Sequence, residues 1–197
     1  TIFADEEKVQ GWCPAPTMWL LNAALSCMQD DEEYLEIGTF CGRSLVAALK
    51  GNKVRANVID PLNLWTQNGT IEDIWNKNVI EYGIKDRVTL HQQFAENFCR
   101  DLPKIGVFFY DGNHDSGHTY EALRKYQPYL SDSAIIIVDD YYIYGGDEQK
   151  TFPGHITDII APVQTDTDRW IRENRNHVKF CITTPWLNGQ AILLYEA

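Results

Sequence analysis

Apolar residues along the chain form short continuous runs that alternate with segments of helical spacing. Continuous apolar runs are typical of strands covered on both faces, as in a parallel sheet. We expect strands at Tyr34–Thr39, Ala56–Asp60, Val88–His91, Val107–Asp111, Ala134–Asp139, Val178–Thr183 and Ala191–Tyr195. We expect helices at Ala15–Met28, Arg43–Lys50, Ile71–Tyr82, Ala95–Asp101, Thr119–Leu130 and Asp166–Asn174. The alternation predicts an α/β fold with a mostly parallel sheet and helices on both of its faces.

The last two predicted strands have no helix between them. The short link at residues 184–189 is rich in turn-forming residues, so these strands should pair as a C-terminal antiparallel hairpin in a seven-stranded sheet. The longest irregular stretch, Tyr142–Thr165, is rich in Gly, Pro and Tyr, and a loop of that length is often a lid or a binding loop. We expect residues 1–33 to form an N-terminal helical segment that packs on the domain or covers it as a lid. Residues 34–197 should form one domain.

The composition favours a protein that acts on small molecules. The 197 residues include 17 basic and 28 acidic side chains, which gives a net charge of −11, and no basic cluster could hold a phosphate backbone. Nucleic acid is therefore not an expected partner. Five cysteines at irregular spacing suit the reduced thiols of a cytoplasm. The sequence has no signal peptide and no apolar run of membrane-spanning length, so we expect a cytoplasmic protein with no membrane partner; a homodimer is left open.

The segment E-I-G-T-F-C-G at residues 36–42 leads from a predicted strand into a predicted helix. Such a turn gathers backbone N–H groups at a helix N-terminus, which suits an anionic or strongly polar ligand. The dinucleotide fingerprint needs three glycines, whereas only Gly38 and Gly42 occur here, with Glu36 ahead of them. This pattern resembles motif I of the class I S-adenosylmethionine-dependent methyltransferases.

The resemblance implies a Rossmann-like methyltransferase fold that binds S-adenosylmethionine. The cofactor contacts that it implies are Glu36, Gly38, Thr39, Gly42, Ser44, Asp60, Gln93, Phe94 and Asp111. Asp60 ends the second strand, at a spacing expected of a carboxylate that accepts the ribose hydroxyls. The alternative is an Asp that caps the turn with Pro61.

The adenine is expected near the end of the third strand. Gln93-Phe94-Ala95 stands where similar methyltransferases often carry G-[DS]-A, but Phe94 departs from that pattern. We expect Gln93, the ring of Phe94 and the amide of Ala95 to contact the adenine. Trp65 either stacks on the adenine or fills the core.

Acidic residues also end the fourth and fifth strands, in the sequences D-G-N-H at residues 111–114 and D-D-Y at residues 139–141. Three neighbouring carboxylates would repel one another unless a proton or a cation lay among them, and hard divalent ions prefer oxygen ligands. The two sequences resemble those of the metal-dependent O-methyltransferases, such as catechol O-methyltransferase and the macrolide-sugar and cephalosporin-pathway enzymes. That resemblance implies Asp111, Asp139 and Asp140 as ligands of Mg²⁺ or another divalent cation.

Successive strand residues face opposite ways, so Asp139 and Asp140 can both reach one ion only if the strand breaks there. The alternative is one Asp that caps the core and one that is solvated.

The general base is implied at His114, three residues beyond Asp111. Many relatives continue D-G-x-H-S-Y-E with a single His, whereas here His118-Thr119-Tyr120-Glu121 matches the second half of that pattern separately. Inserted residues could therefore have moved the base to His118, at a helix N-terminus that would lower its pKa. Both histidines stay candidates, with His114 favoured by its offset from Asp111.

The sequence is thus interpreted as a small-molecule O-methyltransferase whose acceptor carries a hydroxyl group. The first alternative is a methyltransferase-like module that binds the cofactor without catalysis. The second is a nicotinamide-dependent enzyme on a related fold, against which the missing third glycine argues.

Overall fold

The computed structural model describes residues 9–142, 161–184 and 189–197. The chain divides into two compact units, Thr1–Val107 and Phe108–Ala197. The strands form a seven-stranded sheet in the order β5-β2-β1-β6-β7-β9-β8. The bounds are β1 (Glu33–Ile37), β2 (Arg55–Ile59), β5 (Val88–His91), β6 (Ile105–Tyr110), β7 (Leu130–Val138), β8 (Val178–Thr184) and β9 (Gln190–Glu196). Because β1, β2 and β5 pair in parallel and β9 is antiparallel to β7 and β8, the predicted C-terminal antiparallel hairpin is confirmed.

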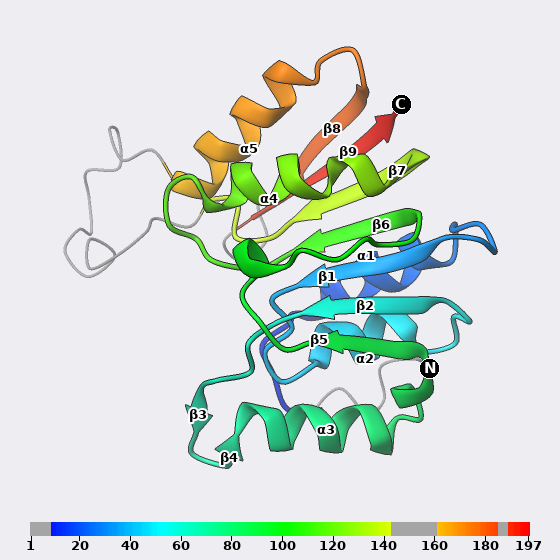
Figure 1. Cartoon of the computed structure of the whole chain (residues 1–197), viewed down its shortest axis with the longest axis vertical. Helices are drawn as coiled ribbons and strands as arrows, with labels where there is room; N and C mark the ends of the chain where they lie inside the picture. The colour runs from blue at the N-terminus through cyan, green and yellow to red at the C-terminus, as the bar shows by residue number, and fades with distance from the viewer. Residues whose placement is uncertain (1–8, 143–160, 185–188) are drawn as a thin grey trace. The chain divides into compact units, whose positions relative to one another are not determined.

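In the first unit, β5, β2 and β1 point the same way, so their carboxyl ends lie at one edge (Figure 1). Its helices are α1 (Ala15–Leu25), α2 (Arg43–Leu49) and α3 (Ile71–Glu81). Helix α1 packs on α2, and the side chain of Asn22 donates to the carbonyls of Ala47 and Lys50, at 2.8 Å each. The N-terminal helix is therefore tied to the C-terminal end of α2.

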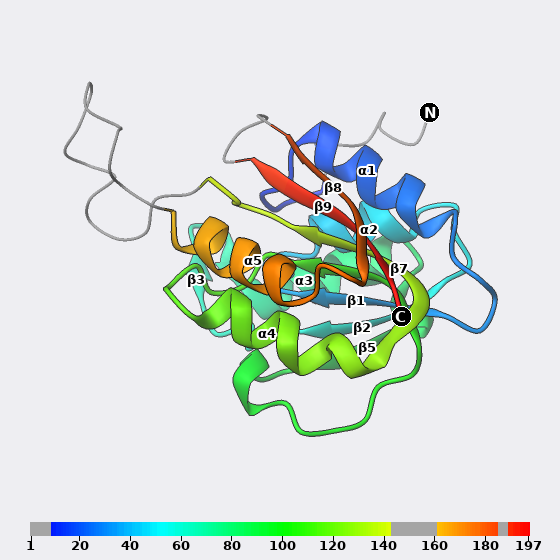
Figure 2. The same ribbon diagram turned by 90° about the horizontal axis from the view of Figure 1, so that it is seen from above.

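In the second unit, α4 (His118–Tyr126) and α5 (Pro162–Glu173) lie on the same face of β7, β9 and β8 (Figure 2). The buried Asp166 of α5 joins the two helices, because its Oδ2 accepts the N–H of Gly117 at 2.7 Å. Gly117 is the N-cap of α4 and offers no side chain for that task. A carboxylate from the neighbouring helix therefore caps α4 and complements its dipole.

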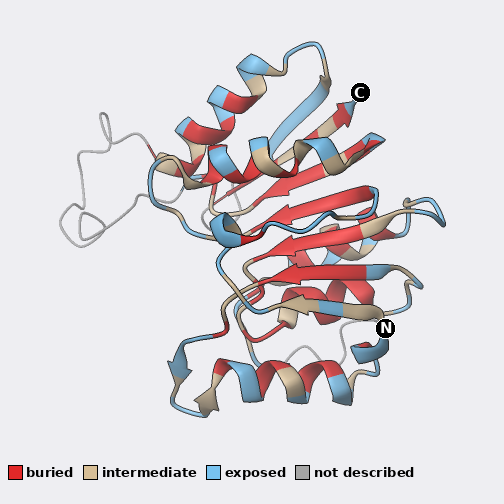
Figure 3. Ribbon diagram, viewed as in Figure 1, coloured by how far each residue is buried: buried red, intermediate tan, exposed pale blue. Residues whose placement is uncertain are grey.

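Burial follows strand position, as Figure 3 shows. Strands β1, β2 and β6 are buried along nearly all of their length, which explains their continuous apolar sequences. The edge strand β8 is exposed from Lys179 to Thr183. Within the described residues, no helix is both long and apolar enough to cross a membrane.

The predicted helix Ala95–Asp101 is wrong. The structure has only a 3₁₀ turn at Ala95–Asn97, and Phe98 is extended and buried, with its ring 4.8 Å from that of His91. Pro103 also disfavours a helical conformation at the residue before it. Packing of Phe98 therefore ends the helical turn.

Other boundaries differ near prolines. The helix predicted to end at Leu130 ends at Tyr126, followed by a 3₁₀ turn that contains Pro128, and β7 starts at Leu130. Helix α5 begins at Pro162, so the loop predicted to reach Thr165 ends earlier. The rest of the predicted lid, residues 143–160, lies outside the described residues, as do residues 185–188 of the hairpin link.

A small antiparallel hairpin between β2 and α3 was not predicted. It consists of β3 (Trp65–Thr66) and β4 (Gly69–Thr70), joined by a two-residue turn at Gln67-Asn68 just before Gly69. Thr70 also caps α3, because its hydroxyl oxygen accepts the N–H of Asp73 at 3.0 Å.

Candidate active site

The turn between β1 and α2 has a strained backbone. Gly38 (φ 81°), Phe40 (φ 49°) and Gly42 (φ 82°) all adopt the left-handed conformation. Glycine does so freely, whereas a residue such as Phe pays about 1–3 kcal/mol. A Cβ added to Gly42 would also lie 2.9 Å from Cδ1 of Trp75. Both the backbone conformation and the packing therefore require glycine at residue 42.

Asp60 holds this turn in place. Its Oδ2 accepts the N–H groups of Thr39 at 2.8 Å and Phe40 at 3.0 Å, and its Oδ1 accepts the N–H of Leu62 at 2.7 Å. Hydrogen bonds to a carboxylate are roughly twice as strong as neutral ones. The turn-capping alternative for Asp60 is thus present in the structure, and its contact with a ribose stays a prediction.

Glu36 and Ser44 form a buried link beneath the turn. Oε1 of Glu36 accepts the Ser44 hydroxyl at 2.7 Å, and Oε2 accepts the Tyr34 hydroxyl at 2.8 Å. Burial raises the pKa of Glu36 to about 7, although hydrogen bonds from Ser44, Tyr34 and Thr39 lower it in part. The two residues connect β1 with α2, and their direct contact with a cofactor stays a prediction.

The residues expected at the adenine lie after β5. The backbone N–H of Gln93 donates to the carbonyl of His91 at 2.8 Å, and the Phe94 side chain is half exposed. Trp65 is 79% exposed on the β3–β4 hairpin, so the core alternative for Trp65 is wrong. Stacking of Trp65 on the adenine, and the roles of Gln93 and Phe94, stay predictions.

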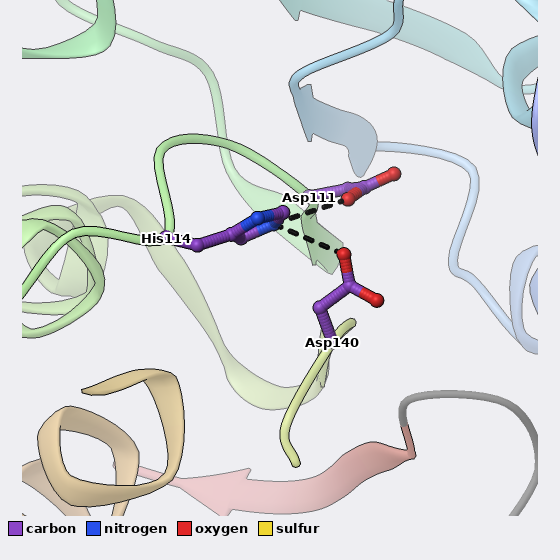
Figure 4. Close-up of side chains that lie close together, drawn as sticks. All are labelled: Asp111, His114 and Asp140. Carbon is purple, nitrogen blue, oxygen red and sulfur yellow. Dashed lines mark ion pairs between the residues drawn. The ribbon is translucent and has the colours of Figure 1, made fainter. Parts of the chain in front are cut away.

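Asp111, His114 and Asp140 come together at the ends of β6 and β7 (Figure 4). Nε2 of His114 lies 3.7 Å from Oδ1 of Asp111 and 3.2 Å from Oδ2 of Asp140. One ligand atom from each side chain lies within 4.8 Å of the others. The three side chains are partly buried, with 20–29% of each exposed. The imidazole therefore lies between two carboxylates that the sequence predicted as metal ligands.

The strand breaks between the two acids of the D-D-Y sequence. Strand β7 ends at Val138, and Asp140 has a φ of 52°. This turn directs Asp140 toward His114, whereas Oδ1 of Asp139 accepts the N–H of Asp140 at 3.0 Å and Nε2 of Gln190 at 3.2 Å. Asp139 is near enough for its charge to raise the pKa of Asp111, but it does not belong to the three-residue cluster.

Two tyrosines fix the loops that carry the cluster. The Tyr110 hydroxyl donates to the carbonyl of Asn113 at 2.7 Å, next to His114. The Tyr141 hydroxyl donates to Oδ1 of Asp168 at 2.6 Å, and the Tyr141 N–H donates to the carbonyl of Gly189 at 3.0 Å. The two hydrogen bonds of Tyr141 thus fix the backbone next to Asp140.

The electrostatics of the cluster favour bound protons. Burial, together with the charges of the neighbouring acids, raises the pKa of Asp111 to about 7 and that of Asp139 to about 6. Burial alone would lower the pKa of His114, but its close approach to Asp111 and the charges of the three acids outweigh burial and raise the pKa. The acids therefore stabilise the protonated form of His114.

His118 lies elsewhere. It is the first residue of α4, and its backbone N–H donates to the carbonyl of Asp115 at 3.2 Å. The structure thus brings His114 to the acids and leaves His118 out of the cluster. This placement favours His114 of the two candidate bases.

The donor set fits a divalent cation. Carboxylate oxygens are the ligands that Mg²⁺ prefers, and an imidazole nitrogen also suits ions such as Mn²⁺. The raised pKa values of Asp111 and Asp139 reflect burial first and the neighbouring acids second, and a bound cation would offset both.

The supporting residues Asp168 and Gln190 were not predicted from the sequence. Their partners lie far along the chain, in α5 and β9, and no local spacing connects them with the D-D-Y sequence. The sequence holds one signal for them. Asp168 and Gln190 are polar residues in segments that also bury residues, and a polar side chain in such a place usually has a hydrogen-bond partner.

Comparisons with known proteins bear on this arrangement. Solved structures that resemble the chain include the O-methyltransferase TomG from Streptomyces achromogenes, involved in tomaymycin synthesis and in complex with SAM, and an O-methyltransferase from Bacillus cereus in complex with SAH. TomG has a TM-score of 0.66 and 20% identity over 100% of this chain and 87% of its own. The Bacillus protein has a TM-score of 0.64 and 17% identity over 99% of this chain and 89% of its own. At such identities the likeness establishes the fold.

An uncharacterised protein of Acanthamoeba polyphaga mimivirus is 29% identical over 153 residues, which is 74% of this chain. The matched stretch spans 66% of the viral protein, just under two thirds of its length. Residues 35–141, from β1 through the D-D-Y sequence, match the family described as "Methyltransferase domain". The match covers more than half of the sequence and both groups of candidate site residues after β1 and β7, and the chain therefore belongs to the methyltransferase domain family.

Proposed function

We propose that this protein is an S-adenosylmethionine-dependent O-methyltransferase that acts on a hydroxyl group of a small molecule. The observation that carries the proposal is the position of His114 between Asp111 and Asp140. A basic nitrogen beside two carboxylates suits removal of a proton from a bound hydroxyl. The SAM and SAH complexes of the two structural relatives support the choice of methyl donor.

The first unit is proposed to bind the cofactor. The turn at Gly38–Gly42 lies at the carboxyl end of β1, where ligands of open α/β sheets bind. Asp60 keeps that turn in its strained conformation before any ligand arrives. A pre-formed turn lowers the ordering cost of binding.

In the proposed reaction, the acceptor hydroxyl gives its proton to Nε2 of His114. A lone pair of the acceptor oxygen attacks the methyl carbon, and the bond from that carbon to sulfur breaks with its electron pair left on sulfur. The products are a methyl ether, neutral S-adenosylhomocysteine and a proton on His114 that passes to solvent. Alignment of oxygen, carbon and sulfur supplies most of the acceleration.

We further propose that Asp111 and Asp140 hold a divalent cation, with Asp139 beside them. Such a cation would lower the pKa of the acceptor hydroxyl. Asp111 and Asp140 would then no longer stabilise the protonated form of His114, so its Nε2 could accept a proton.

Incubation of the protein with S-adenosylmethionine labelled on its methyl group, a divalent cation and a panel of catechols and sugar-like diols tests this function. Label in an acceptor, with an equal amount of S-adenosylhomocysteine, is the expected result. Cofactor binding without transfer to any acceptor would favour the non-catalytic module instead.

A further inference from the structure

The segment just before α1 is clamped onto the turn that follows β1. The Asn78 side chain donates to the carbonyls of Gln10 at 3.1 Å and Cys41 at 2.8 Å, so one amide joins the segment to the turn. Nη1 of Arg43 donates to the carbonyl of Gly11 at 3.2 Å. A Cβ on Gly11, which has a φ of +135°, would lie 2.7 Å from Cβ of Arg43. The backbone of residues 10–11 is therefore fixed against the turn and the start of α2.

The next residue, Trp12, places its ring beside Phe40. The ring centroids lie 5.3 Å apart at an interplanar angle of 33°. The Trp12 side chain is nonetheless 87% exposed, the most exposed of the large hydrophobic residues in the described part of the chain. A tryptophan on a fixed backbone that leaves most of its ring in water contributes little to the core, and its ring is free to contact a ligand.

Phe40 is held in its strained conformation. It has a φ of 49°, and its N–H donates to Oδ2 of Asp60 at 3.0 Å. Strain of this kind persists only where the surroundings impose it and is concentrated at ligand sites. Asp60 and Asn78, from two different elements, thus fix the two backbones that present the aromatic pair.

We propose that Trp12 and Phe40 form an aromatic wall that contacts the sulfonium end of S-adenosylmethionine. The inference rests on the proposed function, since it assigns this cofactor to the turn after β1. The adenine is expected after β5, and β2 lies between β5 and β1 in the sheet. The methionine end of the cofactor is therefore expected at the turn after β1. An aromatic face attracts a cation by its quadrupole, and the sulfonium is the one cationic centre that methyl transfer removes.

The aromatic wall should distinguish the methyl donor from its product. S-adenosylmethionine carries the positive sulfur, whereas S-adenosylhomocysteine has a neutral thioether at the same place. A cation–π contact should therefore strengthen binding of the first ligand and leave the second nearly unchanged. A purely structural Trp12, which only holds residues 10–13 on the turn, would affect both ligands equally.

Calorimetric titration with each ligand separates these cases in the wild type, Trp12→Leu, Trp12→Phe and the control Trp19→Leu. Trp19 is an exposed tryptophan of α1 and is not part of the aromatic pair. Trp12→Leu should weaken S-adenosylmethionine about three- to thirty-fold and S-adenosylhomocysteine less than about twofold. Trp12→Phe should keep most of the selectivity, and Trp19→Leu should match the wild type.

Equal weakening of both ligands, or no weakening, would overturn the aromatic wall while leaving the proposed function intact. Failure of the wild type to bind either ligand would overturn the proposed function and the wall together. Circular dichroism checks that each variant folds, and if Trp12→Leu does not fold, the ratio of the two affinities in Trp12→Phe decides. A ratio in Trp12→Phe close to one would also overturn the inference.

Discussion

Nε2 of His114 lies 3.2 Å from Oδ2 of Asp140, although the two residues come from loops after different strands. The contact depends on the left-handed turn at Asp140, which directs this side chain away from the course of β7. The same turn leaves Asp139 bonded to Gln190. Two adjacent acids thereby have different surroundings, and their substitutions should differ in effect.

Replacement of the proposed base should lower turnover and spare cofactor binding. His114→Ala removes the nitrogen beside the acids, and loss of a general base typically costs about a hundredfold or more in rate. His118→Ala is expected to be much milder, because His118 lies outside the cluster. Initial rates of labelled methyl transfer, with S-adenosylhomocysteine affinity as the control, check this prediction. The reverse ranking of the two histidines would assign the base to the start of α4.

Metal binding should depend on Asp140 more than on a neighbouring exposed acid. Asp140→Asn removes a charged oxygen from the cluster, so Mn²⁺ should bind about tenfold more weakly or worse in a calorimetric titration. Asp115→Asn, in the same loop as His114 but on the surface, serves as the matched control and should bind as the wild type does. Equal Mn²⁺ affinity in all three proteins would remove this cluster from the metal site.

Asp60→Ala should destabilise the protein even without a cofactor. The N–H groups of Thr39, Phe40 and Leu62 would lose their charged acceptor, and hydrogen bonds to charged groups contribute about 1.5–3 kcal/mol each, with some compensation from water. We expect the free energy of unfolding to fall by roughly 2–4 kcal/mol. Urea titration of the ligand-free protein measures it. A variant as stable as the wild type that no longer binds the cofactor would instead assign Asp60 to the ribose alone.

Glu36 should make the ligand-free protein less stable as the pH rises. Its pKa is raised from 4.5 to about 7 in the folded state, so between these values the folded state holds a proton that the unfolded state has lost. Stability therefore falls across this window and levels off above it, by about 3 kcal/mol in total from this group. Asp111 and Asp139, with raised pKa values, act in the same direction.

The variant Glu36→Gln isolates the contribution of Glu36. Urea titrations should give similar stabilities for the two proteins near pH 4.5, with the variant increasingly more stable than the wild type by pH 8. Parallel curves for the two proteins across this range would show that Glu36 stays charged in the folded state.

The positions of the buried strands along the chain were predictable because each is a continuous apolar run. The helix predicted at Ala95–Asp101 failed because the burial of Phe98, a tertiary contact with His91, outweighs the local pattern. Two errors had local signals: the turn-forming residues Asn68 and Gly69 at the β3–β4 hairpin, and Pro162 at the first position of α5.

In the candidate site, the residues that end the strands could be predicted, since parallel strands bring their carboxyl ends to one edge. The groups that these residues contact could not be predicted. The three hydrogen bonds of Asp60 and the left-handed conformation of Asp140 depend on backbone geometry that residue types alone do not encode. The pairing of Trp12 with Phe40 depends on Asn78, a polar residue in the middle of α3.

Thermal or urea unfolding of the wild type with S-adenosylhomocysteine, and in parallel with NAD, tests the central claim most directly. A ligand at a hundred times its dissociation constant adds about 2.7 kcal/mol to stability if it binds only the folded state. The account predicts this stabilisation with S-adenosylhomocysteine and none with NAD. Stabilisation by NAD alone would contradict the assignment of an S-adenosylmethionine-dependent enzyme.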